Sequence, residues 1–279
     1  SNNMTFGTIG GGKVEHDLTN LAINCLHIEQ YKTQLFQKKH YASATDASGQ
    51  LCGGKQTVAT IICQQSDLPL LQTLQQTDKN NCPVILEVSP DGLKISQMTE
   101  NISTPFFHYS DQSDWCYKSI IGLVKRAYII GGGHVSLALT QVLVLLGFEV
   151  TVIEQRSAVK SMEDNSLASQ KRIMPYTEVG QAVTHAIQAY VFVMTHSHET
   201  DQQVIESLAA KNFKYLGVLG SRHKIELMKK NLKAKVSEQN WQSIHAPVGL
   251  AINSHTPMEI AISIAAELIQ FDNHPKMPK

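Results

Sequence analysis

The feature that most constrains the fold of this chain is a glycine triplet between apolar segments in its second half. The run Ala127-Tyr-Ile-Ile-Gly-Gly-Gly-His134 joins a short β-branched stretch, typical of a buried strand, to Gly131, Gly132 and Gly133, which allow a tight turn. Residues 135–146 follow as an apolar run long enough for a helix that packs on a sheet. This order predicts a strand, a glycine turn and a helix in one compact unit.

The next segment completes a unit of the dinucleotide-binding type. A second strand, residues 150–153, carries Glu154 at its carboxyl end, roughly 20 residues after the turn, where such folds bind a ribose hydroxyl. Free amide groups at the helix start, together with the helix dipole, favour a phosphate there. Ser136 stands where the G-x-G-x-x-G pattern has its third glycine, and close helix–strand contact tolerates serine nearly as well. We therefore predict an α/β fold with a Rossmann-like parallel sheet, and a dinucleotide is one candidate ligand.

Length and composition set the domain number and exclude several partners. The 279 residues suit two domains, a smaller α+β domain at residues 1–115 and the Rossmann-like domain at 123–272. Because 24 basic and 24 acidic residues balance, neither nucleic acid nor an anionic membrane is indicated. No apolar run reaches the ~20 residues of a membrane span, and no signal peptide is visible. The 5 cysteines lack C-x-x-C spacing, which favours a reduced, cytoplasmic protein.

The first half alternates helical and strand-like patterns. A glycine loop at residues 8–15 opens a helix predicted from about residue 14 to residue 30, with Glu15 in the first turn, where the helix dipole favours an acid. Further expected elements are strands at 41–45, 56–63, 83–88 and 93–96, a helix at 68–76 and a turn at 89–92. The polar, aperiodic stretch 101–119 suits a linker, with the domain boundary near 110–122.

Cys52 is the candidate functional thiol. Gly53 and Gly54 follow it at the mouth of a predicted strand, so a ligand can approach its backbone closely. The other four cysteines lie in apolar or featureless contexts and are interpreted as structural. Most single cysteines are inert packing residues, and that alternative stays open for Cys52.

Two segments of the second half follow predicted strands, at the edge where open α/β sheets bind ligands. Thr195-His-Ser-His-Glu-Thr-Asp201 follows a strand at 189–194, and Gly220-Ser-Arg-His-Lys224 follows a strand at 215–219. Ser221 and Arg222 could hold an anion together, or could simply form a solvated helix start. His196, His198 and Asp201 could chelate a metal, although one turn needs a further ligand from elsewhere.

The remaining segments are interpreted as structural. Residues 156–179 are low in hydrophobicity and predict a surface connection, and residues 244–250 predict a loop that carries His245. Thr256 and Glu259, with Pro257 at the first helical position, form a capping box that opens the last helix.

Several of these motifs, in this order, resemble the XdhC/CoxI family of xanthine dehydrogenase accessory proteins. In the second half they are the segments 195–201, 216–222, 244–250 and 256–267, and upstream they are 131–134, 8–15 and 52–54. The resemblance covers nearly the whole chain, and it implies a factor that binds the molybdenum cofactor, a phosphorylated pterin dithiolene. It also implies help with sulfuration through a cysteine desulfurase and delivery to a xanthine dehydrogenase-type molybdoenzyme.

The motifs and the resemblance together give one set of expected cofactor-binding residues. They are Gly11, Gly12, Glu15, Cys52, Gly53, Gly54, Gly131, Gly133, His134, Glu154, Thr195, His196, His198, Asp201, Gly220, Ser221, Arg222 and His245. The chain departs from the family pattern at Lys13, where members often have a cysteine, and at Glu154-Gln155, where an acidic pair is more usual before Arg156. The amino-terminal strands typical of the family are not seen, and Met4 enters at once into what reads as the middle of a fold.

Three functions are compatible with these features. The leading one is a cofactor-binding accessory protein without turnover of its own, with a homodimer as the favoured assembly. An NAD(P)-dependent oxidoreductase that uses the turn at Gly131–Gly133 is the alternative, although no Tyr-x-x-x-Lys pair accompanies the fold. A metal-dependent hydrolase at His196, His198 and Asp201 is the weakest.

Overall fold

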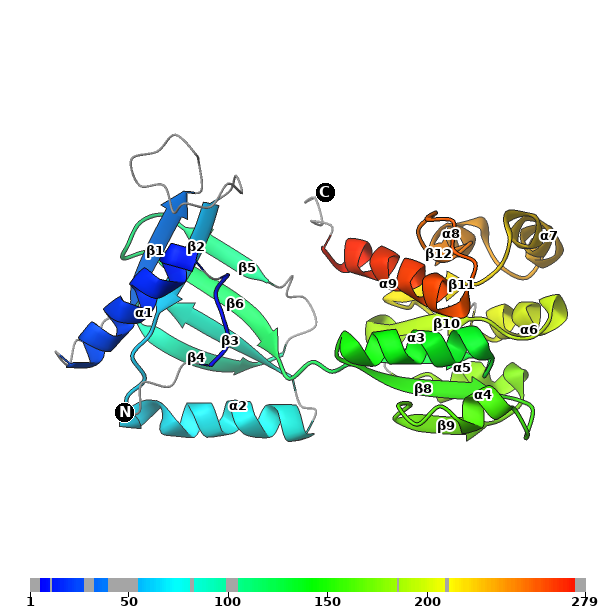
Figure 1. The fold of residues 1–279 in the computed structure, drawn as a ribbon, viewed down its shortest axis with the longest axis horizontal. Coiled ribbons are helices and arrows are strands. Elements are labelled where there is room, and N and C mark those ends of the chain that lie inside the picture. The colour runs from blue at the N-terminus through cyan, green and yellow to red at the C-terminus, as the bar shows by residue number, and fades with distance from the viewer. Residues whose placement is uncertain are drawn as a thin grey trace. The chain divides into compact units, whose positions relative to one another are not determined.

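The computed structural model describes residues 6–10, 12–27, 33–39, 55–80, 83–98, 105–184, 186–208 and 211–273. The chain divides into two compact units, Ser1–Leu123 and Val124–Lys279, each described here by itself (Figure 1). Among the described helices, none combines the length and the apolar character needed to cross a bilayer. The strand expected at 41–45 lies outside the described residues.

The first unit is built on antiparallel strands. A four-stranded sheet has the order β4-β3-β6-β5, and β1 pairs with β2 in a separate ribbon. Leu35 of the ribbon packs with Val88 and Trp115 of the sheet, which joins the two layers in a small core. The elements are α1 Gly12–His27, β1 Gln34–Lys39, β2 Lys55–Thr60, a 3-10 turn Gln65–Asp67, α2 Leu68–Asn80, β3 Val84–Ser89, β4 Gly92–Gln97, β5 Phe106–Tyr109 and β6 Trp115–Ile121.

The predicted linker over 101–119 is wrong wherever the structure describes it. β5 and β6 pair with each other, and β6 also pairs with β3, so the first unit runs to Leu123, beyond residue 115. All four residues of the edge strand β5 are exposed, so it shows no inside–outside alternation that a sequence pattern could reveal. The hairpin of β3 and β4 around the turn at 89–92 is confirmed.

The second unit is a six-stranded parallel sheet with the order β12-β11-β10-β7-β8-β9. Numbered from β7 onward, this is the 3-2-1-4-5-6 order of the Rossmann fold, and the predicted fold class is confirmed. The strands are β7 Lys125–Ile130, β8 Phe148–Glu154, β9 Gln170–Ile173, β10 Ala189–Val193, β11 Tyr215–Val218 and β12 Ile244–His245. The helices are α3 His134–Leu145, α4 Lys160–Glu163, α5 Val179–Ala182, α6 His198–Leu208, α7 Arg222–Leu232, α8 Glu238–Gln242 and α9 Pro257–Asn273, with 3-10 turns at Tyr176–Glu178 and Ala186–Gln188.

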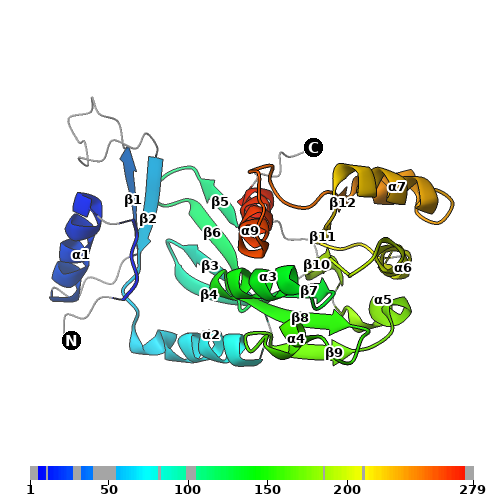
Figure 2. The same cartoon turned by 45° about the vertical axis from the view of Figure 1, so that its right-hand side comes forward.

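Helices cover both faces of this sheet (Figure 2). Alternate residues of the central strands divide between two buried clusters: Ile129 and Phe192 face α3 and α9, while Ile130 and Val191 face α6 and α7. Strands buried on both faces read as continuous apolar runs, which is why 127–130 and 189–193 were recognisable as strands. Most of residues 156–179 are exposed, as the expected surface connection requires, but the segment also contains α4 and β9 and buries Met162, Tyr176 and Val179.

Helix α9 is capped at its start and fastened to the sheet near its end. Near its beginning, the capping box is confirmed: Thr256 Oγ1 accepts from the amide of Glu259, whose carboxylate accepts from the amides of His255 and Thr256. Near its end, Asp272 accepts a 2.7 Å hydrogen bond from Tyr190 Oη. The same carboxylate pairs with Lys125 at 3.0 Å and with Lys214 at 3.1 Å. These partners lie at the starts of β7, β10 and β11.

Candidate functional site

The candidate site lies at the carboxyl edge of the six-stranded sheet. Because all its strands are parallel, the segments that follow β7, β8, β10 and β11 leave the sheet at the same edge. The strand order reverses between β7 and β10, and ligands bind at such a switch point in open α/β sheets. The Gly131 turn and the Thr195–Asp201 segment flank this point.

Gly131 and Gly133 play different parts in the turn after β7. Gly131 has φ +114°, and a Cβ there would lie 2.7 Å from the carbonyl carbon of Met194 and 2.9 Å from Cα of Thr195. Only glycine therefore lets the turn touch the end of β10. Gly133 is the N-cap of α3 and has no side-chain cap, and a Cβ on it would meet nothing within 4 Å. The start of α3 is thus open to an anion.

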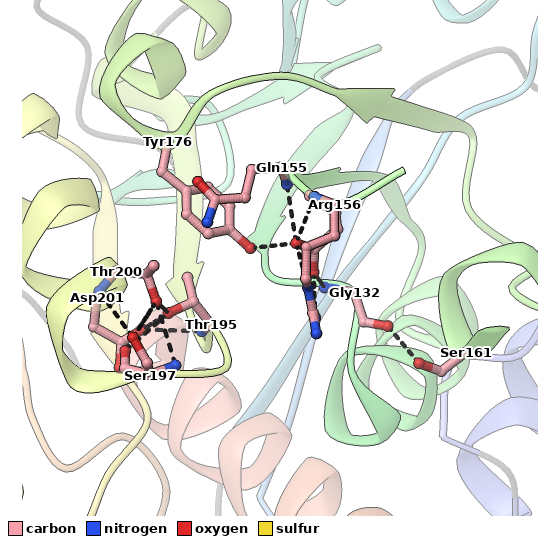
Figure 3. Close-up of polar contacts among 10 residues, drawn as sticks. Gly132, Gln155, Arg156, Ser161, Tyr176, Thr195, Ser197, Thr200 and Asp201 are labelled. Carbon is pink, nitrogen blue, oxygen red and sulfur yellow. Dashed lines mark hydrogen bonds and ion pairs between the residues drawn. The ribbon is translucent and has the colours of Figure 1, made fainter. Parts of the chain in front are cut away.

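Glu154 at the end of β8 is completely buried and does not face an open ribose site. Its carboxylate accepts hydrogen bonds from the amides of Gly132 at 2.9 Å, Gln155 at 2.9 Å and Arg156 at 3.1 Å. Tyr176 Oη donates at 2.9 Å (Figure 3), and the Arg156 guanidinium donates through Nε at 3.1 Å and Nη2 at 2.9 Å. The carboxylate therefore ties the glycine turn to the loop after β8.

These contacts keep Glu154 ionised although it is buried. Burial alone would raise the pKa of this carboxyl, but the Arg156 guanidinium, the amides of Gly132 and Arg156 and the Tyr176 hydroxyl outweigh it and lower the pKa to about 2. Burial and the nearby carboxylate raise the pKa of Tyr176, so its hydroxyl stays a donor. Ser161 Oγ also donates to the carbonyl of Gly132 at 2.5 Å, which holds the turn from α4 (Figure 3).

The segment after β10 is organised by Asp201. Its buried Oδ1 accepts from the amide of Thr195 at 2.9 Å and from Thr195 Oγ1 at 2.6 Å, and its Oδ2 pairs with Lys224 Nζ at 2.5 Å. Thr200 Oγ1 lies 2.5 Å from Thr195 Oγ1 and 3.1 Å from Ser197 Oγ (Figure 3). Because Asp201 belongs to α6 and Lys224 to α7, this ion pair joins the first turns of the helices that follow β10 and β11.

The predicted histidines do not form a metal centre with Asp201. Within the described part of the chain, no group of three or more His, Cys, Asp or Glu side chains is arranged to hold a metal ion. His196 is exposed, while His198 opens α6, with its Nε2 2.5 Å from Gln202 Nε2. The Nδ1 of His198 is buried without a hydrogen-bond partner.

The remaining expected residues of this unit fall into two groups. His134 and Arg222 are exposed in the first turns of α3 and α7, and Ser221 caps α7 by accepting from the amide of Lys224 at 3.2 Å. His245 instead stacks on Tyr215 at 4.2 Å between ring centroids, and its Nδ1 lies 2.7 Å from Glu267. Packing and this hydrogen bond account for His245.

In the first unit, only part of the expected set can be placed. Gly12 opens α1, and Glu15 accepts from Thr8 Oγ1 at 2.5 Å and from the amide of Ile9 at 2.8 Å, which closes the loop before the helix. A broad groove of about 800 Å³ runs beside this loop and α1. Gly11, Cys52, Gly53 and Gly54 lie outside the described residues.

Sequence reasoning missed the residues that organise the site from beneath. Arg156, Tyr176 and Ser161 converge on Glu154 and the glycine turn, and Lys224 pairs with Asp201. The contact of Arg156 could have been predicted, because this cation lies two residues after Glu154, the acid that ends a predicted strand. Tyr176 and Ser161 gave no signal, because their partners are distant in sequence.

Comparison with known proteins identifies relatives of both units. A family model described as the XdhC Rossmann domain matches residues 127–268. The uncharacterized protein YqeB of Escherichia coli (strain K12) is 26% identical over 270 residues, which make up 96% of this chain and 38% of that protein. The chain therefore spans well under half the length of that relative.

Two further relatives carry a xanthine dehydrogenase name. A protein of Bacillus subtilis (strain 168), named as a probable subunit of xanthine dehydrogenase, is 26% identical over 246 residues, 88% of this chain and 68% of that protein. A crystal structure described as a xanthine dehydrogenase from Bacillus halodurans has a TM-score of 0.72 at 20% identity, covering 98% of this chain and 84% of that one. At this identity the second match shows a shared fold.

Proposed function

Because this chain belongs to the XdhC family, we propose that it is an accessory protein in the maturation of a xanthine dehydrogenase-type molybdoenzyme. In this role it binds the molybdenum cofactor and transfers it to the enzyme, without turnover of its own. A relative named as part of a xanthine dehydrogenase supports this choice of partner. A cysteine desulfurase that sulfurates the cofactor, and a homodimer as the assembly, belong to the same proposal.

The observation that carries the proposal is the open glycine turn at the switch point of the sheet. The cofactor ends in a phosphate, and the uncapped start of α3 beside Gly133 offers amide donors to such a group. Thr195 and its neighbouring hydroxyls, held by Asp201, border the same edge. These residues fit the phosphate end of the cofactor. A thiolate suits a soft metal–sulfur group, and Cys52 is the thiol that we propose to test for a part in cofactor binding or transfer.

The experiment is an anaerobic, reducing titration of the full chain with molybdenum cofactor, followed by transfer to a cofactor-free xanthine dehydrogenase. We expect near-stoichiometric binding and restored enzyme activity. Cys52→Ala should weaken binding or transfer, and Cys63→Ala is the matched control because Cys63 is an exposed free thiol. If wild type binds no cofactor, the accessory function is refuted, and equal behaviour of Cys52→Ala and wild type removes Cys52 from it.

An NAD(P)-dependent oxidoreductase is the second candidate, and the glycine turn favours it. The saturated, buried carboxylate of Glu154 argues against ribose binding in the usual manner. Titration with NAD and with NADP in the same series separates the two functions, because a carrier needs neither nucleotide for transfer.

A further inference from the structure

Arg156 combines a fixed orientation with an accessible donor edge. It lies directly after β8, at the carboxyl edge of the six-stranded sheet, and its Nε and Nη2 grip the Glu154 carboxylate at 3.1 and 2.9 Å. Its side chain is 44% exposed, whereas the carboxylate it grips is 0% exposed. One edge of the guanidinium is therefore anchored and the other is reachable from solvent.

Glu154 itself has no capacity left for a ligand. A carboxylate offers about four lone-pair sites, and the protein already directs hydrogen bonds at it from Gly132, Gln155, Arg156 and Tyr176. A ribose diol at this position would have to displace buried donors, each of which would then be left unsatisfied. The acid that usually reads a ribose here is thus committed to the fold.

The donors of Arg156 are only partly used. A guanidinium has about five N–H donors in a planar fork, and Glu154 takes one from Nε and one from Nη2. The rest, including both on Nη1, have no protein acceptor among the residues that the structure describes. Because the plane is already fixed, little side-chain freedom is lost when a phosphate binds, and the fork geometry matches phosphate oxygens.

We propose that Arg156 binds a phosphomonoester of the ligand held by this unit, and that Glu154 is the positioning residue that orients it. The phosphate could belong to a nucleotide that carries a 2′-phosphate or to the pterin cofactor. Only the pterin source rests on the accessory function proposed above. In either case the site discriminates against a neutral diol at the end of β8.

The test uses the full chain and probes that differ by one phosphate. NADP⁺ should bind at least about tenfold more tightly than NAD⁺, the effect expected of a charge-assisted hydrogen-bonded pair. Arg156→Gln should abolish that preference, and Arg156→Lys, which keeps the charge without the fork, should retain part of it. In parallel, anaerobic titration with molybdenum cofactor shows whether Arg156→Gln weakens pterin binding.

Three further variants keep the test sharp. Arg126→Gln removes a guanidinium at the opposite end of the sheet, where Arg126 faces Glu149 at 3.7 Å. It should change neither the NADP⁺ preference nor the affinity for molybdenum cofactor. Glu154→Gln should lower the NADP⁺ preference because the fork loses its anchor. The double variant Glu154→Gln/Arg156→Gln leaves no buried unpaired charge, so its loss of preference would not reflect misfolding.

The outcomes separate the two proposals. An Arg156-dependent preference for NADP⁺, or a pterin affinity that falls in Arg156→Gln, supports the phosphate site. If Arg156→Gln changes neither the nucleotide ratio nor the cofactor affinity, the phosphate site is overturned even when the cofactor binds. If wild type ignores the cofactor yet shows the NADP⁺ preference, the accessory function fails alone.

Discussion

Replacing Gly131 by alanine tests how the glycine turn is built. At φ +114° an L side chain is strained by about 1–3 kcal/mol. The added Cβ would also press on the backbone of Met194 and Thr195, at 2.7 and 2.9 Å, where no flexible side chain can yield. Overpacking of this kind costs about 1–3 kcal/mol. We therefore expect Gly131→Ala to lower the free energy of unfolding of this unit by about 2–6 kcal/mol.

Gly133→Ala is the matched control for this prediction. Gly133 has φ −74° and ψ −176°, which any residue adopts, and a Cβ on it would meet nothing within 4 Å. Its substitution should change stability by less than about 0.5 kcal/mol. The same added methyl group is thus expected to destabilise the protein at position 131 and to leave its stability unchanged at position 133.

Thermal and urea unfolding of both variants measure the difference. In a unit of this size, each kcal/mol shifts Tm by about 2–4 °C, so Gly131→Ala should unfold at least about 4 °C below wild type. Hydrogen exchange should also report loosening of Thr195, whose amide bonds Asp201. Equal Tm values for the two variants would refute the reasoning, because strain and backbone contact distinguish the two positions.

Three other changes follow from contacts in the second unit. The pKa of Glu154 is lowered to about 2 from an ordinary 4.5, so the stability that its carboxylate contributes is full above pH 4.5 and is lost as pH falls toward 2. In acid unfolding, the difference in stability between wild type and Glu154→Gln should therefore narrow over that range. A difference that stays constant would contradict this prediction. Lys224→Met leaves the Asp201 carboxylate buried without its cation and should lower the free energy of unfolding, measured in urea, by about 3–5 kcal/mol. The double variant Lys224→Met/Asp201→Asn should recover part of that loss. A loss below about 1 kcal/mol would indicate that water reaches Asp201. Thr256→Ala removes the cap of α9 and should cost about 1 kcal/mol, against a few tenths for Thr256→Gly; equal losses would mean that the cap hydrogen bond contributes little.

The second unit could be predicted well from the sequence because its strands, turn and helix cap depend on residues that are close together in the chain. The run at 127–130 is apolar on both faces of the sheet, and the glycines between strand and helix admit few alternatives. The capping box at Thr256 was readable for the same reason, since its partners are three residues apart. These elements could be placed before any tertiary contact was known.

The site's supporting contacts could not be predicted in this way. Glu154 reads as a ribose acceptor from its position, but Tyr176, which lies 22 residues on, turns it into a buried anchor. Likewise the sequence presents Asp201 as a metal ligand, but its carboxylate pairs with the ammonium group of Lys224, which lies 23 residues further along. The edge strand β5 was missed because none of its side chains is buried, so exposure erased the pattern that would have revealed it.

The fastening of α9 has a consequence for how the second unit is made during synthesis. Asp272 joins Lys125 at the start of β7 to Tyr190 of β10 and to Lys214, which directly precedes β11, and α9 also packs along α3. A growing chain emerges amino end first, so Lys125 of β7 is made almost 150 residues before Asp272, the α9 residue that it contacts. Until α9 is made, the α3 side chains that pack on it, such as Leu139 and Leu143, lack their partners from that helix. A chain that ends before Pro257 should therefore expose these apolar side chains and unfold more easily than the full chain.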